Sequence, residues 1–531
     1  MAVTVNGGTS FEWGNTSGDH VTAVIDGPAW SARGLVQHDS RYPLKVEGAV
    51  QRAVKLLLPG FSTASEYVRY FALYAALAAH ADDRGLDGEA CRELVRRSEV
   101  VLAAVTTLDD DNTAGPERRA HGADGVRPWM GPEGLDVRNA VSIGDEQHSY
   151  SPRKSGFWGS YGGPSQILGT VVVESKAFRA GRHACPAAVR ELFAPLFAAA
   201  VDDRLARPQL QALGALSLHS DALPEVPWLL DLFTATRNSH HDPEQWLPDD
   251  RRRRATMRIL GRTTVLHGTD TGLTWQEAVE AAVAFSDALE TDPILAGIAG
   301  AAAWRGVLLR NYSVSAWRRL WAALVHSIGP KDEHKDRSVQ ELQAWLADQM
   351  PLMTVRAFMD ELPPGMTGGH PAPAEWQVLA DGQAEDPLTN IQLLLLGVRR
   401  ASELEGEART VFVGRQNEIL NPLWMERCVD VFRDRPLRDL AVRLVDDMLA
   451  QARRVALEKM QPDSSGRLQI YSRIHERNGR YYKTREEGDA PIGTRLEVAA
   501  GVAGQLGLID VEESGAAAIS GLGSAVLGVE A

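Results

Sequence analysis

Leu437-Arg-Asp-Leu-Ala-Val-Arg-Leu-Val-Asp-Asp-Met-Leu449 has the most regular pattern in the chain, because its apolar residues recur three and four positions apart. This spacing puts them on one face of an amphipathic helix, which we expect to span 437–460. Comparable patterns predict helices over 48–58, 64–80, 88–105, 186–201, 222–233, 248–266, 274–289, 294–328, 338–350 and 387–404. Thr63 and Glu66 have capping-box spacing at the start of the helix over 64–80. The sequence therefore predicts a mainly α fold.

The pattern changes after the helix over 437–460. Residues alternate between polar and apolar in Leu468-Gln-Ile-Tyr-Ser-Arg-Ile474, which indicates a strand, and Asn478-Gly479 is a strong hairpin-turn signal. A returning strand over 481–484, a helix over 491–506 and a strand pair after residue 507 complete the order. This order predicts a small, winged-helix-like α/β module at the C-terminus.

The length of 531 residues exceeds what one hydrophobic core usually holds. We expect a helical N-terminal domain over 1–110 and a Gly/Pro/Arg-rich loop region with short strands over 111–180. A central helical domain over 181–405 follows, and 406–531 holds the long helix and the winged-helix-like module. Within 294–328, where a break near Tyr312 is expected, one stripe is predicted to be core: Trp317, Leu320, Trp321, Leu324 and Ile328.

Composition narrows the class of protein. The net charge of −14 argues against a chain-wide nucleic-acid coat, and no apolar run approaches the roughly 20 residues of a membrane span. Residues 1–17 lack the pattern of a secretory signal. Cys91, Cys185 and Cys428 are too scattered for a disulfide framework or a cysteine zinc site. We expect a soluble, cytoplasmic, bacterial-type protein that has no cofactor and does not bind a membrane.

A basic segment coincides with the predicted hairpin. Between residues 467 and 485 the only acid is Glu476, whereas six residues are basic: Arg467, Arg473, Arg477, Arg480, Lys483 and Arg485. Tyr471 and Tyr482 lie among them. Cations neutralise phosphates and aromatic rings stack on bases, so the pattern suits a nucleic-acid backbone. The alternative is an edge hairpin protected from aggregation by its charges. The helix over 491–506 carries a single base, Arg495, which is poor for a recognition helix.

A second basic segment is the run of four arginines at 251–254, followed by Arg258 and Arg262. Helical spacing places four of them near one face, where guanidinium groups could contact phosphates or carboxylates: Arg251, Arg254, Arg258 and Arg262. The alternative is a solvated helix face paired with the neighbouring acids.

Catalytic motifs are weak. Val171-Val-Val-Glu-Ser-Lys176 resembles the second half of a restriction-endonuclease-like magnesium site, with Glu174 and Lys176 joined by Asp145 as the first acid. Glu-x-Lys is common by chance, however, and no helix and central strands are predicted upstream. His240-His241-Asp242 has no second cluster at metal-ligand spacing. The chain has no phosphate-binding P-loop motif, and no Gly-x-Ser-x-Gly appears in strand–helix context. We expect no metal site. The weakness of these motifs favours a non-catalytic protein over an enzyme, and both alternatives stay open.

The segment 152–164 concentrates glycines, aromatic residues and two bases. Arg153, Lys154, Phe157, Trp158 and Tyr161 could bind a partner or a phosphate, since glycines allow the backbone to approach a ligand closely. Alternatively, the aromatic side chains fill the core.

Two blocks resemble an uncharacterised bacterial family. The first is Leu56-Leu57-Leu58-Pro59-Gly60-Phe61-Ser62-Thr63 with Val68-Arg69-Tyr70-Phe71, and the second is Arg153 to Pro164. The resemblance covers about half of the chain, and such proteins are encoded near helicases, methyltransferases or ATPases in anti-phage defence islands. Together with the missing catalytic motifs and the basic segments, this resemblance predicts a non-catalytic subunit or adaptor of a defence complex, which binds protein partners and could also contact a nucleic-acid backbone. The alternatives are a magnesium-dependent nuclease and a winged-helix transcription regulator.

Overall fold

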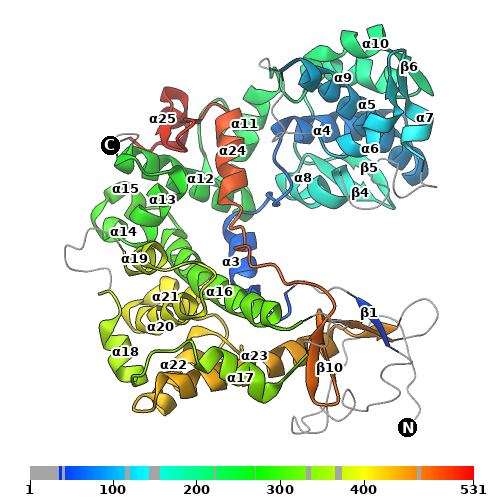
Figure 1. The fold of residues 1–531 in the computed structure, drawn as a ribbon. Helices are drawn as coiled ribbons and strands as arrows, with labels where there is room; N and C mark the ends of the chain where they lie inside the picture. The colour runs from blue at the N-terminus through cyan, green and yellow to red at the C-terminus, as the bar shows by residue number, and fades with distance from the viewer. Residues whose placement is uncertain are drawn as a thin grey trace. The chain divides into compact units, whose positions relative to one another are not determined.

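The computed structural model describes residues 35–38, 42–113, 120–142, 156–220, 223–268, 271–329, 336–364, 373–462 and 468–530. The chain is mostly helical with several small sheets, which confirms the expected fold class (Figure 1). It divides into two compact units that each gather distant parts of the sequence. Unit 1 comprises Met1–Gly48, Asn311–Glu403 and Val413–Ile492, and unit 2 comprises Ala49–Arg310, Leu404–Phe412 and Gly493–Ala531.

Unit 2 contains two groups of packed helices. In the first, α4 (Val68–Asp83), α5 (Gly88–Thr113) and α9 (Ala187–Ala199) pack together, and the hairpin of β4 (Val171–Glu174) and β5 (Ala177–Ala180) lies against α4 and α5. In the second, α12 (Pro248–His267) contacts α11 (Val226–Thr234), α13 (Trp275–Val279) and α25 (Gly521–Leu527). Burial of apolar faces between these helices stabilises both groups.

Unit 2 also contains shorter helices and strands. They are α3 (Gly48–Leu57), α6 (Ala123–Val126), α7 (Val137–Ala140), α8 (Gly162–Leu168), α10 (Arg207–Ala212), α14 (Ala288–Thr291), α15 (Pro293–Ala296), α21 (Gly406–Val413) and α24 (Leu496–Gln505). β3 (Gly134–Asp136) pairs with β2 (Met130–Gly131) and β6 (Arg204–Ala206), and β12 (Ile509–Val511) pairs with β13 (Ala517–Ile519), all antiparallel. α16 (Ala301–Ser327) begins in unit 2 and ends in unit 1.

In unit 1, α23 (Leu437–Glu458) is contacted by α17 (Val339–Ala347), α18 (Val355–Glu361) and α22 (Pro422–Phe432). α20 (Pro387–Glu403) packs on α22 and on α19 (Ala374–Asp381). β9 (Leu468–Tyr471) pairs in parallel with β1 (Leu35–His38) and antiparallel with β8 (Gln461–Pro462). β10 (Ile474–Arg477) and β11 (Arg480–Lys483) form an antiparallel hairpin, whose second strand also pairs with β7 (Arg337–Ser338).

Several expectations are confirmed residue by residue. The helices predicted from Gly48, Gly88, Pro248, Pro387 and Leu437 begin at those residues. The predicted core stripe from Trp317 to Ile328 is buried. Asn478 and Gly479 have φ values of 53° and 74°, the left-handed pair that a two-residue hairpin turn requires.

Other expectations were wrong. The helix predicted from residue 64 begins at Val68, because Ser62 to Ser65 instead form a turn in which Ser62 N donates to Ser65 Oγ. α16 runs through Tyr312 without a break and starts later than expected, after Gly300 at a φ of 85°. The stretch 468–474 holds two strands rather than one, because its two ends pair with different partners.

Within the described parts of the chain, no helix is both long and apolar enough to cross a lipid bilayer.

Candidate functional site

The two sequence blocks singled out above, 56–71 and 153–164, pack against each other in unit 2. Ser62 Oγ donates a hydrogen bond to the carbonyl oxygen of Ser160 at 2.9 Å, and Tyr67 N donates to the hydroxyl of Tyr161 at 3.0 Å. The described part of the second block begins at Gly156. Arg153 and Lys154 therefore lie outside the described residues.

The second block forms a π-helix over Phe157–Tyr161, an uncommon turn that is frequent at functional sites. Its first and last rings, Phe157 and Tyr161, are buried, whereas Trp158 is 42% exposed. The ring centroid of Trp158 lies 5.1 Å from that of Phe157 and 5.4 Å from that of Phe178. These contacts orient the indole and leave part of it open to solvent.

A buried carboxylate holds the start of the π-helix. Glu99 Oε1 accepts hydrogen bonds from Phe157 N at 2.7 Å and from the Tyr74 hydroxyl at 2.6 Å. Gly156 has a φ of 62°, and a Cβ there would lie 2.2 Å from Glu99 Oε1. Only glycine fits this position, because any side chain would need the left-handed region and would collide with the carboxylate.

An aromatic cluster supports the π-helix from α4. The centroid of Tyr161 lies 4.9 Å from that of Tyr70 and 5.1 Å from that of Phe71, while His121 stacks edge-on against Tyr161 at 5.4 Å. Burial raises the pKa of both Tyr70 and Tyr161, and burial lowers the pKa of His121. The cluster therefore stays neutral near pH 7, so its hydroxyls act as hydrogen-bonding groups rather than as bases.

The arginine run on α12 faces mainly inward. Arg254, Arg258 and Arg262 donate to backbone carbonyls at and just beyond the C-terminal end of α25, at 2.9, 2.9 and 2.8 Å. Carbonyls at a helix C-terminus lack intrahelical partners and attract cations. Burial lowers the pKa of Arg254 to about 10. Arg254 and Arg258 thus bind the C-terminal end of α25, and Arg251 is the exposed member of the predicted phosphate-binding face.

Half of the six cations of the basic hairpin are neutralised by ion pairs. Three pair with acids outside it: Arg473 with Glu487 (3.1 Å), Arg480 with Asp336 (3.1 Å) and Glu341 (3.0 Å), and Lys483 with Glu486 (2.5 Å). Two of these acids, Glu486 and Glu487, follow directly after the basic segment 467–485. The other two come from the segment that provides β7 and α17.

The remaining hairpin residues are more open. Arg477 and Arg485 are exposed, and Arg467 lies outside the described residues. The Tyr471 hydroxyl donates to Gln469 Oε1 at 2.8 Å, and the Tyr482 ring lies 5.7 Å from that of His475. Both tyrosine rings are half-buried, so neither presents a fully open stacking face.

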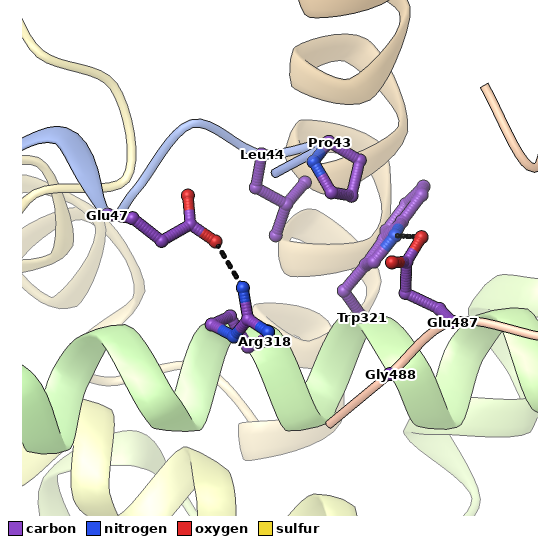
Figure 2. Close-up of a pocket in the computed structure, with 7 residues that line it drawn as sticks. All are labelled: Pro43, Leu44, Glu47, Arg318, Trp321, Glu487 and Gly488. Carbon is purple, nitrogen blue, oxygen red and sulfur yellow. Dashed lines mark hydrogen bonds and ion pairs between the residues drawn. The ribbon is translucent and has the colours of Figure 1, made fainter. Parts of the chain in front are cut away.

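Glu487, which pairs with Arg473 just before β10, also lines a small hollow in unit 1 (Figure 2). Glu47 is buried, and its Oε1 accepts from Arg318 Nη1 at 2.9 Å, whereas its Oε2 has no hydrogen-bond partner among the described residues. Trp321 Nε1 donates to Glu487 Oε2 at 3.4 Å. Burial raises the pKa of Glu487, and the charge of Arg473 opposes that rise.

We expect Arg473→Gln to destabilise unit 1 by about 1–3 kcal/mol, because Glu487 loses a charged hydrogen bond in a largely buried place. A carboxyl whose pKa is raised by folding binds more protons in the folded chain, so the free energy of unfolding falls as pH rises through that pKa. The variant should show a steeper fall than the wild type in urea denaturation between pH 4 and 8.

Adding Glu487→Gln to this variant should remove the extra pH dependence. Arg477→Gln serves as the control, because Arg477 is exposed at the turn. An unchanged pH profile in Arg473→Gln would contradict the assignment.

The nuclease-like motif lies in a tight turn. Glu174 ends β4 and Lys176 precedes β5; both are exposed, and Ser175 and Lys176 have positive φ values of 50° and 70°. Asp145 lies outside the described residues. In the described parts of the chain, no three side chains among His, Cys, Asp and Glu gather as metal ligands. The expected recognition helix is α24, which contains no basic residue, and Arg495 before it donates to the carbonyl of Phe61 at 2.7 Å.

Sequence patterns did not point to Glu99 or to the buried pair of Arg69 and Glu225. Each is a charged residue within a helical pattern, which is ordinarily a solvated position. Glu99 offered one signal, because it interrupts the apolar face of the predicted helix over 88–105.

Comparison of the chain with protein-family models, with curated proteins and with solved structures gives no match.

Proposed function

We propose that this chain is a non-catalytic subunit or adaptor of a bacterial anti-phage defence complex in the cytoplasm, and that it binds a protein partner through Trp158. The observation that carries the proposal is the exposed indole on a π-helix whose neighbouring rings are buried. Tryptophan is enriched among residues that dominate protein interfaces, and a side chain oriented before binding loses less entropy. The defence setting rests on the resemblance of the two blocks.

Nucleic-acid binding through the basic hairpin has less support, because Arg473, Arg480 and Lys483 are paired with carboxylates. A nuclease based on Glu174 and Lys176 likewise has less support, because no three potential metal ligands gather among the described residues. A transcription regulator would need cations on α24, which has none.

We expect Trp158→Ala to weaken partner binding by at least about thirtyfold, the effect of losing an interface tryptophan worth about 2 kcal/mol or more. The test expresses the tagged chain with the proteins encoded beside it and measures co-purification together with plaque formation under phage challenge. The variant should lose both the partner and protection.

Leu352→Ala provides the matched control, because Leu352 is 94% exposed in unit 1 and belongs to neither block. Both variants should melt like the wild type. If Trp158→Ala keeps the partner and the protection, Trp158 is not the binding residue.

A further inference from the structure

In unit 2, His183 lies beside Trp246, and Arg182, Arg237 and Arg253 lie close enough to His183 to lower its pKa. The ring of His183 lies 5.4 Å from the Trp246 ring, and the guanidinium of Arg237 lies 5.8 Å from it. Arg182 precedes His183 in the chain, and its Nη2 contacts Asp250 at 3.0 Å. Arg253 on α12 reaches the same carboxylate at 2.6 Å.

Of the charged groups that act on His183, three are guanidinium groups and one is a carboxylate, that of Asp250. Asp250 is buried and accepts from Arg182, from Arg253 and from Leu247 N, so its oxygens are fully engaged. One carboxylate thus faces two guanidinium groups directly, and Arg237 adds a third guanidinium beside the Trp246 ring. The excess positive charge favours the binding of an anionic ligand.

Several donors in the cluster remain open. The Arg182 side chain is 32% exposed, and neither its Nε nor its Nη1 has a hydrogen-bond partner among the described residues. Arg237 is exposed, and its guanidinium likewise donates to none of the residues that the structure describes. Deeper in the cluster, Arg253 Nη1 and His183 Nε2 are buried and also lack a partner within the described chain. Buried polar groups are nearly always satisfied, so these atoms are consistent with an occupant that is a ligand or water.

The backbone holds the exposed arginines in place at a conformational cost. Arg237 lies in a turn where Ala235, Asn238 and Ser239 all have positive φ values. Asp231 stabilises that turn by accepting from the Thr236 hydroxyl at 3.0 Å and from Asn238 N at 3.2 Å. Strained turns of this kind cluster at functional sites, because the surrounding structure must maintain them.

Arg182 is positioned by a close approach to the backbone. A Cβ at Gly169, whose φ is 82°, would lie 2.3 Å from Arg182 Nη1. The guanidinium of Arg182 therefore packs directly against the backbone of Gly169, where a side chain would displace it.

We propose that Arg182 and Arg237, backed by Arg253 and His183 beside Trp246, form a binding site for a phosphoryl group. Guanidinium groups bind phosphate oxygens through paired, charge-assisted hydrogen bonds. Burial first, and then the charges of the surrounding arginines, lower the pKa of His183 to about 4, so the imidazole is neutral near pH 7 and offers one N–H donor. A bound dianion would offset those charges and raise the pKa of His183.

The test uses the full chain and inorganic phosphate at constant ionic strength, with chloride as the balancing anion. Calorimetry measures binding, and NMR follows the His183 ring as pH is varied. We expect saturable phosphate binding, a His183 pKa that rises when phosphate is present, and at least about tenfold weaker binding in Arg237→Gln, the effect of one charged hydrogen bond.

Arg204→Gln is the control, since that side chain is 84% exposed in the same unit and lies outside the cluster. It should bind phosphate like the wild type, and both variants should melt normally. Absence of saturable binding, an unmoved His183 pKa, or equal weakening in the control would overturn the site. Acetate binding as tight as that of phosphate would overturn the phosphoryl assignment.

Discussion

Replacing Arg69 by methionine should lower the free energy of unfolding of unit 2 by about 3–5 kcal/mol, because a buried carboxylate then loses its counter-ion. Arg69 Nε donates to Glu225 Oε1 at 2.7 Å, and both side chains are essentially inaccessible to solvent. Its Nη1 also donates to the carbonyl oxygens of Ala215 and Ser217, at 2.9 and 2.5 Å. One guanidinium thus joins the start of α4 to the segments before α11.

Denaturation by urea, with hydrogen exchange read from the peptides of α4, measures this loss within unit 2. Adding Glu225→Gln should recover part of it, since the unpaired buried charge is then removed. Arg138→Met is the control, because that side chain is 77% exposed and should change stability by no more than about 0.5 kcal/mol. A loss below about 1 kcal/mol for Arg69→Met would contradict this expectation, because Glu225 would then not remain as an unpaired buried charge.

Replacing Gly156 by alanine should cost about 3 kcal/mol and also impair partner binding by Trp158. The new Cβ would occupy a left-handed backbone at φ 62° and overlap the carboxylate of Glu99 at 2.2 Å. Glu99 would then have to release Phe157 N, which anchors the π-helix. Thermal unfolding measures the cost, and the tryptophan emission spectrum reports any change around the indole.

Gly163→Ala is a close control on the same segment. A Cβ at Gly163 meets no atom within 4 Å, and the residue lies in the first turn of α8. Alanine there should be neutral or stabilise the chain by up to about 1 kcal/mol. Equal melting temperatures for Gly156→Ala and the wild type would mean that the π-helix does not depend on the fit at Gly156.

Charge near the hairpin shows how a sequence window can mislead. Residues 467–485 carry six bases and one acid, but extending the window to 489 adds Glu486, Glu487 and Asp489. Two of these acids pair with the hairpin in the fold. Asp336 and Glu341 contribute as well, and no local count could include them.

The sequence by itself determined the features that depend on neighbours along the chain. Apolar spacing located α12, α20 and α23, and Asn478-Gly479 located the hairpin turn, because helix periodicity and left-handed turns are local properties. Tertiary structure alone decided the features that join distant residues. These are the parallel pairing of β1 with β9, the capping of α25 by arginines of α12, and the packing of the π-helix onto α4. Whether a charged side chain is solvated or buried depends on which partner the fold brings to it, and spacing in one chain does not encode that partner.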